Sequence, residues 1–370
     1  MRRIADVKPT RRARVLGIAG LSAVVLAGGA FVATNGSDAS TGAVEVSVLL
    51  PDTGSSARWE AADKPALQAA FAKAGVGASV RNAGGDPTTQ QQQAQEAMVA
   101  GAKVLLLVGL DTDASAAIST VAHARGVKVV HYDRFGPGAG SDAYVSFDNR
   151  RVGQLQGEAL LSCLKAKGVS KPRIALVHGS PDDNNATQFA EGYRGVVDPL
   201  FAKGSAVEVA SEAVPGWVPA KGMTIFAKMF RDSGGKIDAV LAANDGLGNA
   251  VIEHLREEKA GPLPVTGQDF TLEAVRNILS GEQCMTVFKD AKKEADAAAK
   301  LAIAYARGEA PGDLLNGETK DGSRSVPSAL LAPEAVTADN VKELAFGAGG
   351  FKREAVCEGE WAAVCEKAGV

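Results

Sequence analysis

The chain has 370 residues, a net charge of -3 and 46% hydrophobic residues. This mixture excludes a disordered or fibrous protein. The slight acidity, and the lack of a dense Lys/Arg stripe beyond the N-terminus, argue against a nucleic-acid partner. A chain of this length usually divides into two domains, because single hydrophobic cores stop growing near ~250–300 residues.

The first 39 residues have the pattern of an export signal. Six Arg and Lys residues within the first 14 positions precede an uncharged run at 15–33, and Ser37, Asp38 and Ala39 fit a small-x-small cleavage site. A run of about 19 apolar residues could also remain as a membrane anchor. Its many Gly and Ala residues favour cleavage. The sequence therefore predicts an exported, extracytoplasmic protein.

From residue 44 onward, short β-branched runs alternate with amphipathic helical patterns. Such alternation predicts a parallel sheet covered by helices on both faces. The first series places strands at 44–50, 78–81, 104–108, 127–130 and 143–147, with helices at 58–74, 88–100 and 114–124. The second places helices at 152–167, 184–202, 246–259 and 290–307, with strands at 173–177, 207–211, 237–242, 265–266 and 284–288.

The two series predict an α/β protein of two doubly wound lobes. Residues 308–325 are polar and Gly-rich and are expected to be irregular, and 326–331 is expected to be a strand that crosses back between the lobes. Several crossings would form a multi-strand hinge. We assign 44–147 plus 289–330 to the first lobe, and 148–288 plus 331–370 to the second.

The four cysteines fit an exported protein with disulfide bonds. Cys357 and Cys365 are close enough in sequence to close a small loop, which leaves Cys163 and Cys284 to pair across the second lobe. No Cys-x-x-Cys or His-x-x-x-His spacing is present, so a metal site is not expected.

Polar side chains follow the ends of the predicted strands. Because ligands bind beyond the carboxyl ends of parallel strands, this edge is a candidate binding site. Carboxylates, amides and cations together satisfy sugar hydroxyls, and indole rings pack on the apolar face of a pyranose. The residues at this edge are Asp133, Arg134, Asn185, Asn244, Asp269 and Lys289, with Trp59 and Trp217 nearby.

Simpler structural roles remain open for several of these residues. Asp133 and Arg134 could form a local ion pair at a strand end. Asn244 is also a good helix N-cap, and Asn185 could belong to a turn with a cap. His131 and His178 are expected to be structural, because no nucleophile motif such as Gly-x-Ser-x-Gly accompanies them.

The order of short motifs resembles that of periplasmic sugar-binding proteins of ABC importers, in particular the D-xylose-binding type. The likeness extends from 44 to about 344 and rests on the motifs at 55–59, 132–134, 146–149, 179–186, 216–217, 243–245 and 267–269. It implies the periplasmic binding protein type I fold, a monomer without cofactor, and an ABC permease as partner. The implied sugar ligands are Arg58, Asp133, Arg134, Asn185, Asn244, Asp269 and Lys289, with Trp217 stacking on the ring. The chain departs from many relatives in lacking a lipoprotein cysteine and in its tail with two cysteines.

Three functions compete for this site. A sugar receptor fits the near balance of three cations and two carboxylates, which favours a neutral sugar over a sugar acid. The resemblance implies that this sugar is a pentose such as D-xylose. Ribose, arabinose and glucose are the alternative ligands. A transcriptional regulator would need a helix-turn-helix where this chain has its export segment. A glycosidase would need a protonated carboxylic acid, whereas Arg134 and Lys289 are expected to keep Asp133 and Asp269 ionised.

Overall fold

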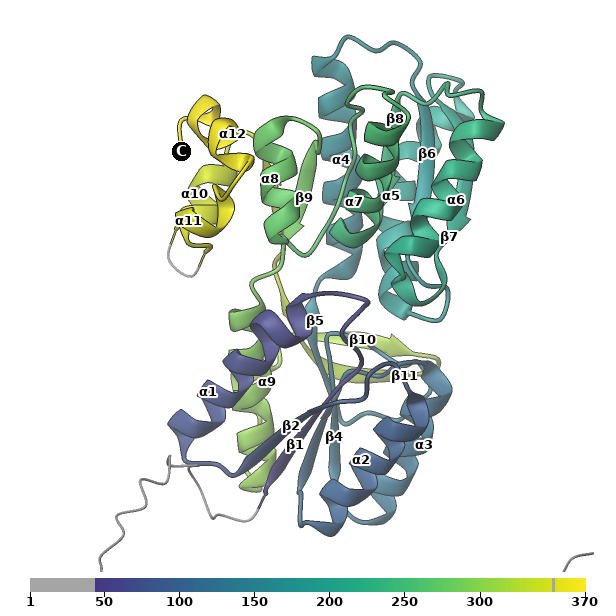
Figure 1. Ribbon diagram of the computed structural model, residues 1–370. Coiled ribbons are helices and arrows are strands. Elements are labelled where there is room, and N and C mark those ends of the chain that lie inside the picture. Colours follow the sequence, from purple (N-terminus) through teal and green to yellow (C-terminus); the bar gives the residue numbers. More distant parts are fainter. Residues whose placement is uncertain (1–43, 348–349) are drawn as a thin grey trace, which may run out of the picture. The chain divides into compact units, whose positions relative to one another are not determined.

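The computed structural model describes residues 44–347 and 350–370. The predicted export signal lies outside the described residues. Among these residues, no helix is both long and apolar enough to cross a membrane. Figure 1 shows two groups of strands, each flanked by helices.

The first lobe is built on a seven-stranded sheet with strand order β10-β11-β5-β4-β3-β1-β2. All neighbouring strands are parallel except β10 and β11. Helices α1 and α9 pack on one face and α2 and α3 on the other, and buried Val, Leu and Ala side chains fill both layers (Figure 1). The strands are β1 (Val46–Leu50), β2 (Ala78–Asn82), β3 (Val104–Leu107), β4 (Lys128–Tyr132), β5 (Ala143–Phe147), β10 (Gly317–Asp321) and β11 (Arg324–Leu331). The helices are α1 (Lys64–Ala74), preceded by the π-helical turn η1 (Trp59–Asp63), α2 (Pro87–Val99), α3 (Thr112–Ala124) and α9 (Ala291–Ala306).

The second lobe has a parallel sheet with strand order β7-β6-β8. A bridge between Val240 and Val265, and a bond from Cys284 N to Val265 O, connect this sheet toward β9 and β12. The strands are β6 (Arg173–His178), β7 (Val207–Ala213), β8 (Ala239–Ala242), β9 (Met285–Phe288) and β12 (Glu334–Thr337). The helices are α4 (Asn149–Ala166), α5 (Asn184–Ala202), α6 (Pro219–Asp232), α7 (Asp245–Glu257) and α8 (Leu272–Ser280).

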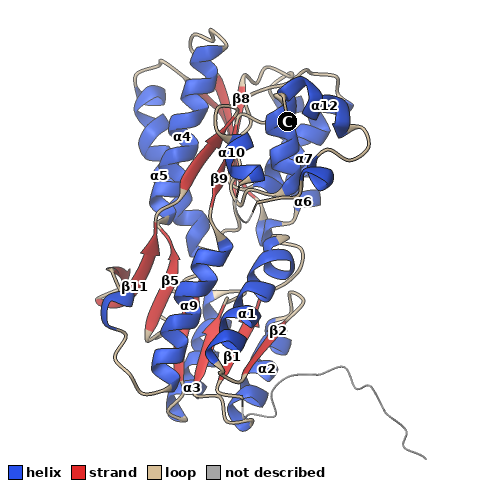
Figure 2. Ribbon diagram, turned by 90° about the vertical axis from the view of Figure 1, so that its left-hand side faces the viewer, coloured by secondary structure: helices blue, strands red, loops and turns tan. Residues whose placement is uncertain are grey.

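The chain passes between the two sheets at three points. It leaves β5 for α4 at Asp148, leaves β9 for α9 at Lys289, and leaves β11 for β12 after Leu331. Asp148 N donates to Leu331 O, so two of these crossings are hydrogen-bonded to each other. Figure 2 shows β5 and β11 side by side at this position. Neighbouring crossings of this kind form the multi-strand hinge that the sequence predicts.

The structure corrects one expected segment and adds others. The region 308–325 is not wholly irregular, because β10 pairs with β11 there and adds an antiparallel edge to the sheet. Helix α8 and the tail helices α10 (Val341–Phe346), α11 (Arg353–Val356) and α12 (Trp361–Ala368) were not anticipated. Both predicted disulfide bonds, Cys163–Cys284 and Cys357–Cys365, are confirmed.

Candidate sugar-binding site

A cavity lies between the two lobes. All nine residues singled out from the sequence line it. Five further residues complete the lining: Ser55, Ser56, Asp183, Phe189 and Gln268. Most lie at strand ends, and several also begin the following helix. Asp183 caps α5 and Asn244 caps α7. Strand ends and helix N-termini therefore both contribute hydrogen-bonding side chains to this edge.

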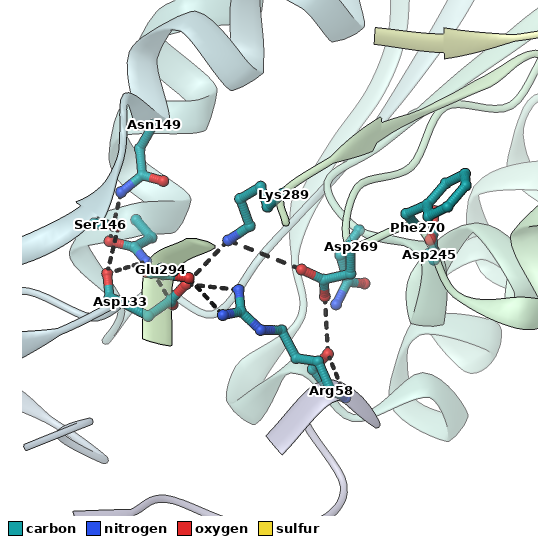
Figure 3. A network of polar contacts seen from close by, with 12 residues as sticks. Arg58, Asp133, Ser146, Asn149, Asp245, Asp269, Phe270, Lys289 and Glu294 are labelled. Carbon is teal, nitrogen blue, oxygen red and sulfur yellow. Dashed lines mark hydrogen bonds and ion pairs between the residues drawn. The ribbon is translucent and has the colours of Figure 1, made fainter. Parts of the chain in front are cut away.

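Arg58 is the centre of a buried ion network. Its Nε and Nη2 donate to the two carboxylate oxygens of Asp63 at 2.8 and 2.7 Å. Nη2 also donates to Glu294 Oε2 at 2.5 Å, and Nη1 donates to Asp133 Oδ2 at 2.9 Å (Figure 3). Tyr132 OH donates to Asp63 as well. The guanidinium is therefore held in a single orientation.

Lys289 connects this network to the opposite wall of the cavity. Its Nζ donates to Asp133 Oδ2 at 3.1 Å and lies 3.9 Å from Asp269 Oδ1. Asp269 in turn accepts a hydrogen bond from Ser56 Oγ at 2.9 Å. We call Arg58, Asp63, Asp133, Lys289 and Glu294 the ion network.

The buried carboxyl groups in this region differ in their pKa values. Burial would raise the pKa of Asp133, but Lys289 and Arg58 lower it to about 2. Burial raises the pKa of Glu294 to about 8, with Arg58 only partly opposing the shift. Burial also raises the pKa of Asp269, since Lys289 is too distant to offset it. The cations therefore outweigh burial at Asp133, whereas burial outweighs the cations at Asp269 and moves its pKa upward.

Arg134 does not pair with its sequence neighbour Asp133. Its Nε lies 3.2 Å from Asp183 Oδ2 and its Nη2 donates to Ser55 Oγ at 2.9 Å. Asp133 pairs instead with Arg58 and Lys289. The local Asp133–Arg134 ion pair is thus absent among the described residues, and removal of Asp133 would deprive Arg58 and Lys289 of a partner.

The two tryptophans are held in place by polar contacts. Trp59 Nε1 donates to Ser55 Oγ at 3.1 Å, and the Arg58 and Arg134 guanidinium groups lie 4.9 and 5.5 Å from its ring centroid. Trp217 Nε1 donates to Asp183 Oδ2 at 3.0 Å. The Trp217 ring also occupies the space that a side chain at Gly179 would need. Both rings are therefore fixed before any ligand binds.

The three amides at the site do not all have the same role. Asn185 Nδ2 donates to Asp133 O at 2.9 Å, and its Oδ1 accepts from Asn149 at 2.9 Å. Asn244 Oδ1 accepts from Leu247 N at 2.9 Å, so it does cap a helix while it lines the cavity. Gln268 was not among the residues expected to bind the ligand. It also lines the cavity and directly precedes Asp269 in the sequence.

Several site residues have a strained backbone. Asp133, Trp217, Asp269 and Phe270 have φ values of 58°, 58°, 101° and 57°. Left-handed conformations are costly for residues other than glycine and tend to cluster where function requires them. The histidines outside the cavity have structural roles instead. His178 bonds to Tyr193 and Ser211, and His131 accepts from Gly136 N.

Two lobes enclosing a cavity of paired charges, amides and indoles define a binding protein for a small polar molecule. The family model for the periplasmic binding protein domain matches residues 46–310. The chain belongs to the periplasmic binding protein domain family, which consists of solute-binding proteins rather than enzymes.

Relatives of this chain include sugar-binding proteins. It is 33% identical over 278 residues to the D-xylose-binding periplasmic protein of Haemophilus influenzae, covering 75% of this chain and 82% of that protein. It is 32% identical to the multiple sugar-binding periplasmic receptor ChvE of Rhizobium radiobacter, covering 84% and 91%. A solved neighbour is the carbohydrate transporter solute binding protein from Chloroflexus aurantiacus in complex with D-glucose, with a TM-score of 0.77, 26% identity and coverage of 84% and 98%.

Proposed function

We propose that this protein is an extracytoplasmic receptor that captures a neutral monosaccharide, D-xylose first among them, and delivers it to an ABC permease. One observation carries the proposal: a single cavity groups two fixed indole rings with hydrogen-bonding side chains from both lobes. Sugars need both kinds of surface, because their C–H faces are apolar and their hydroxyls must be paired once water is removed. The names of the relatives support the same ligand class.

The charges around the cavity favour a neutral ligand. The sequence count of three cations against two carboxylates omitted Asp63, Asp183 and Glu294, which the structure places beside Arg58 and Arg134. The carboxyl groups therefore outnumber the cations, even with a proton on Glu294. A sugar acid would add a further negative charge to this surplus.

The preference for a pentose rests on the resemblance to D-xylose-binding proteins. A hexose would have to place its hydroxymethyl group against a lining whose charged groups are already paired. An unpaired buried hydroxyl costs about 1–3 kcal/mol, which corresponds to roughly ten- to a hundredfold in affinity. Receptors for ribose, arabinose or glucose are the alternatives, and the glucose-bound neighbour keeps glucose among them.

Titration calorimetry with xylose, ribose, arabinose, glucose and galacturonate tests the proposal. We expect xylose to bind most tightly, galacturonate not to bind, and every sugar to be recovered unchanged. Asp269→Ala should abolish binding, whereas Asp313→Ala, at an exposed position, should not alter it. Binding of none of these sugars would refute the receptor, and tighter binding of glucose than of xylose would refute only the pentose preference.

Closure of the two lobes around the sugar is part of the proposal. Three adjacent crossings can act as a hinge that absorbs a rotation between the lobes. Ser56 bonds to Asp269, and Asn185 bonds to Asp133, across the cavity, so an opening rotation would break these contacts and closure would restore them. Solution scattering should show a smaller radius of gyration with saturating sugar. An unchanged radius would contradict closure.

A further inference from the structure

Gln268 is the described residue that both lines the cavity and carries a buried polar atom without a partner. Its side chain is 4% exposed, and its Oε1 accepts no hydrogen bond from any described residue. The other buried atoms of this kind, such as Gln283 Oε1 and Glu294 Oε1, belong to residues outside the cavity lining. Because native proteins pair nearly all buried polar atoms, an unpaired acceptor in a residue that lines a cavity is a candidate partner for a ligand group.

The loop that carries Gln268 has an unusual backbone conformation. Gly267 precedes it, and a side chain there would lie 2.0 Å from Asp245 Oδ1. Asp269 and Phe270, which follow it, both have positive φ values. Successive left-handed residues other than glycine persist only where the surroundings enforce them.

Hydrogen bonds with Asp245 hold this loop in its conformation. Its Oδ2 accepts from Thr271 N at 2.8 Å, and its Oδ1 accepts from Thr286 Oγ1 at 2.7 Å and Gln283 Nε2 at 3.1 Å. Its backbone N–H donates to Gln268 O at 3.0 Å. Figure 3 shows Asp245 beside Phe270, close to Asp269. Gln268 therefore lines the cavity on a main chain that Asp245 holds in place, and its Oε1 has no hydrogen-bond partner among the described residues.

The chemistry of the open atom restricts what can fill it. A carbonyl oxygen accepts a hydrogen bond, so its partner must donate one. A hydroxyl group meets this need, whereas a methylene, an ether oxygen or a carboxylate does not. Leaving the acceptor unpaired when a ligand closes the site costs a substantial part of the binding free energy.

We propose that Gln268 is a specificity-determining residue that accepts a hydrogen bond from one hydroxyl of the bound sugar. The inference rests on the proposed function and adds to it a residue to which the resemblance assigns no role. It assigns discrimination at one position of the sugar to a neutral amide rather than to the ion network.

A double-mutant cycle between protein and ligand tests this role. Calorimetry compares the monosaccharide that binds most tightly with its monodeoxy analogues, each lacking one hydroxyl, for the wild type and for Gln268→Met. In the wild type, one analogue should bind about tenfold or more weaker because Gln268 loses its partner. In Gln268→Met the parent sugar should be weakened by a similar factor, and removal of that same hydroxyl should cost little more.

The matched controls separate this role from a structural one. Gln92→Met makes the same change at an exposed position of α2 and should leave every affinity unchanged. Gln268→Ala repeats the cycle with a smaller side chain, and thermal unfolding shows that each variant is folded. Penalties that are the same for every analogue in wild type and variants would overturn the role of Gln268 while leaving the receptor intact. If no monosaccharide binds the wild type, the proposed function fails and this inference fails with it.

Discussion

Two parts of the cavity lining differ in how completely their polar groups are paired. In the ion network, Arg58 contacts three carboxyl groups and Lys289 contacts two. The opposite part consists of Trp217, Asn244 and Gln268, which carry no charge, and we call it the neutral face. There Asn244 caps a helix, and Gln268 keeps an acceptor open.

This difference suggests that the two parts have different roles in the proposed receptor. The ion network is largely satisfied without ligand, so it fixes the shape of the cavity and costs little reorganisation when a sugar binds. On the neutral face, Gln268 has an acceptor without a partner, so it can form a new bond without breaking an existing one, and discrimination between similar sugars should arise there.

Arg58→Met should cause the largest change, because it leaves Asp63, Asp133 and Glu294 without their shared partner. Breaking a buried ion pair by removing one member typically costs about 3–5 kcal/mol. We expect the free energy of unfolding to fall by about this amount and sugar binding to be lost. Chemical denaturation and calorimetry measure the two effects.

The exposed ion pair between Arg81 and Glu96 provides the matched control. Arg81→Met removes the same kind of side chain where both partners are about half exposed. Surface pairs contribute about 0–1 kcal/mol, so stability and binding should remain close to those of the wild type. If Arg58→Met and Arg81→Met lowered the free energy of unfolding and the sugar affinity equally, Arg58 would not be the centre of the ion network.

Glu294→Gln should change how stability depends on pH. Burial raises the pKa of Glu294 to about 8 from its ordinary value of 4.5, so the folded protein keeps a proton that the unfolded chain releases. The stability due to this group is fully present below about pH 4.5 and is lost as the pH rises through 8. Glutamine keeps the neutral form at every pH.

Denaturation of wild type and Glu294→Gln at pH 5, 6.5 and 8 measures this effect. The free energy of unfolding of the wild type should fall relative to the variant, by about 1–3 kcal/mol over this range. Asp245, whose pKa burial raises to about 7, remains in both proteins and cancels in the comparison. Glu253→Gln, at an exposed position, should follow the wild type, and parallel curves for all three proteins would refute a buried proton on Glu294.

The members of the site were largely predictable from the sequence, but their pairing was not. Parallel strands bring their carboxyl ends to one edge, so polar residues after each strand were expected to meet there. The partners of Asp133, however, come from 75 and 156 positions away. Its neighbour Arg134 pairs with Asp183 instead.

Some missed residues left a trace in the sequence and others did not. Glu294 falls on the buried alanine stripe of α9, next to Ala291, Ala295 and Ala298, and a charged residue on an apolar stripe indicates a buried partner. Gln268 lies within the motif at 267–269, but the motif gave it no role of its own. Its role depends on an unpaired atom and a strained loop, and neither follows from a pattern of residue types.

Trp217→Phe should have a moderate effect confined to the neutral face. Phenylalanine keeps an aromatic surface for the sugar but loses the N–H that donates to Asp183 Oδ2. Asp183 retains its ion pair with Arg134. We therefore expect affinity to fall by about fivefold, equivalent to about 1 kcal/mol, with stability changed less than in Arg58→Met. Calorimetry and denaturation of the same sample test this, and a loss of all binding would show that the indole does more than stack.

The smallest expected effect is that of salt on sugar affinity. A neutral sugar carries no charge to be screened, and the ion network is buried, where salt screens weakly. Affinity should therefore change by less than about twofold between roughly 0.05 and 0.5 M salt. Titrations in NaCl and in KCl separate screening from binding of a particular cation. A fall in affinity of fivefold or more would mean that unpaired charge in the ion network attracts the ligand. The contrast between a fully paired ion network and a neutral face that discriminates between sugars would then not hold.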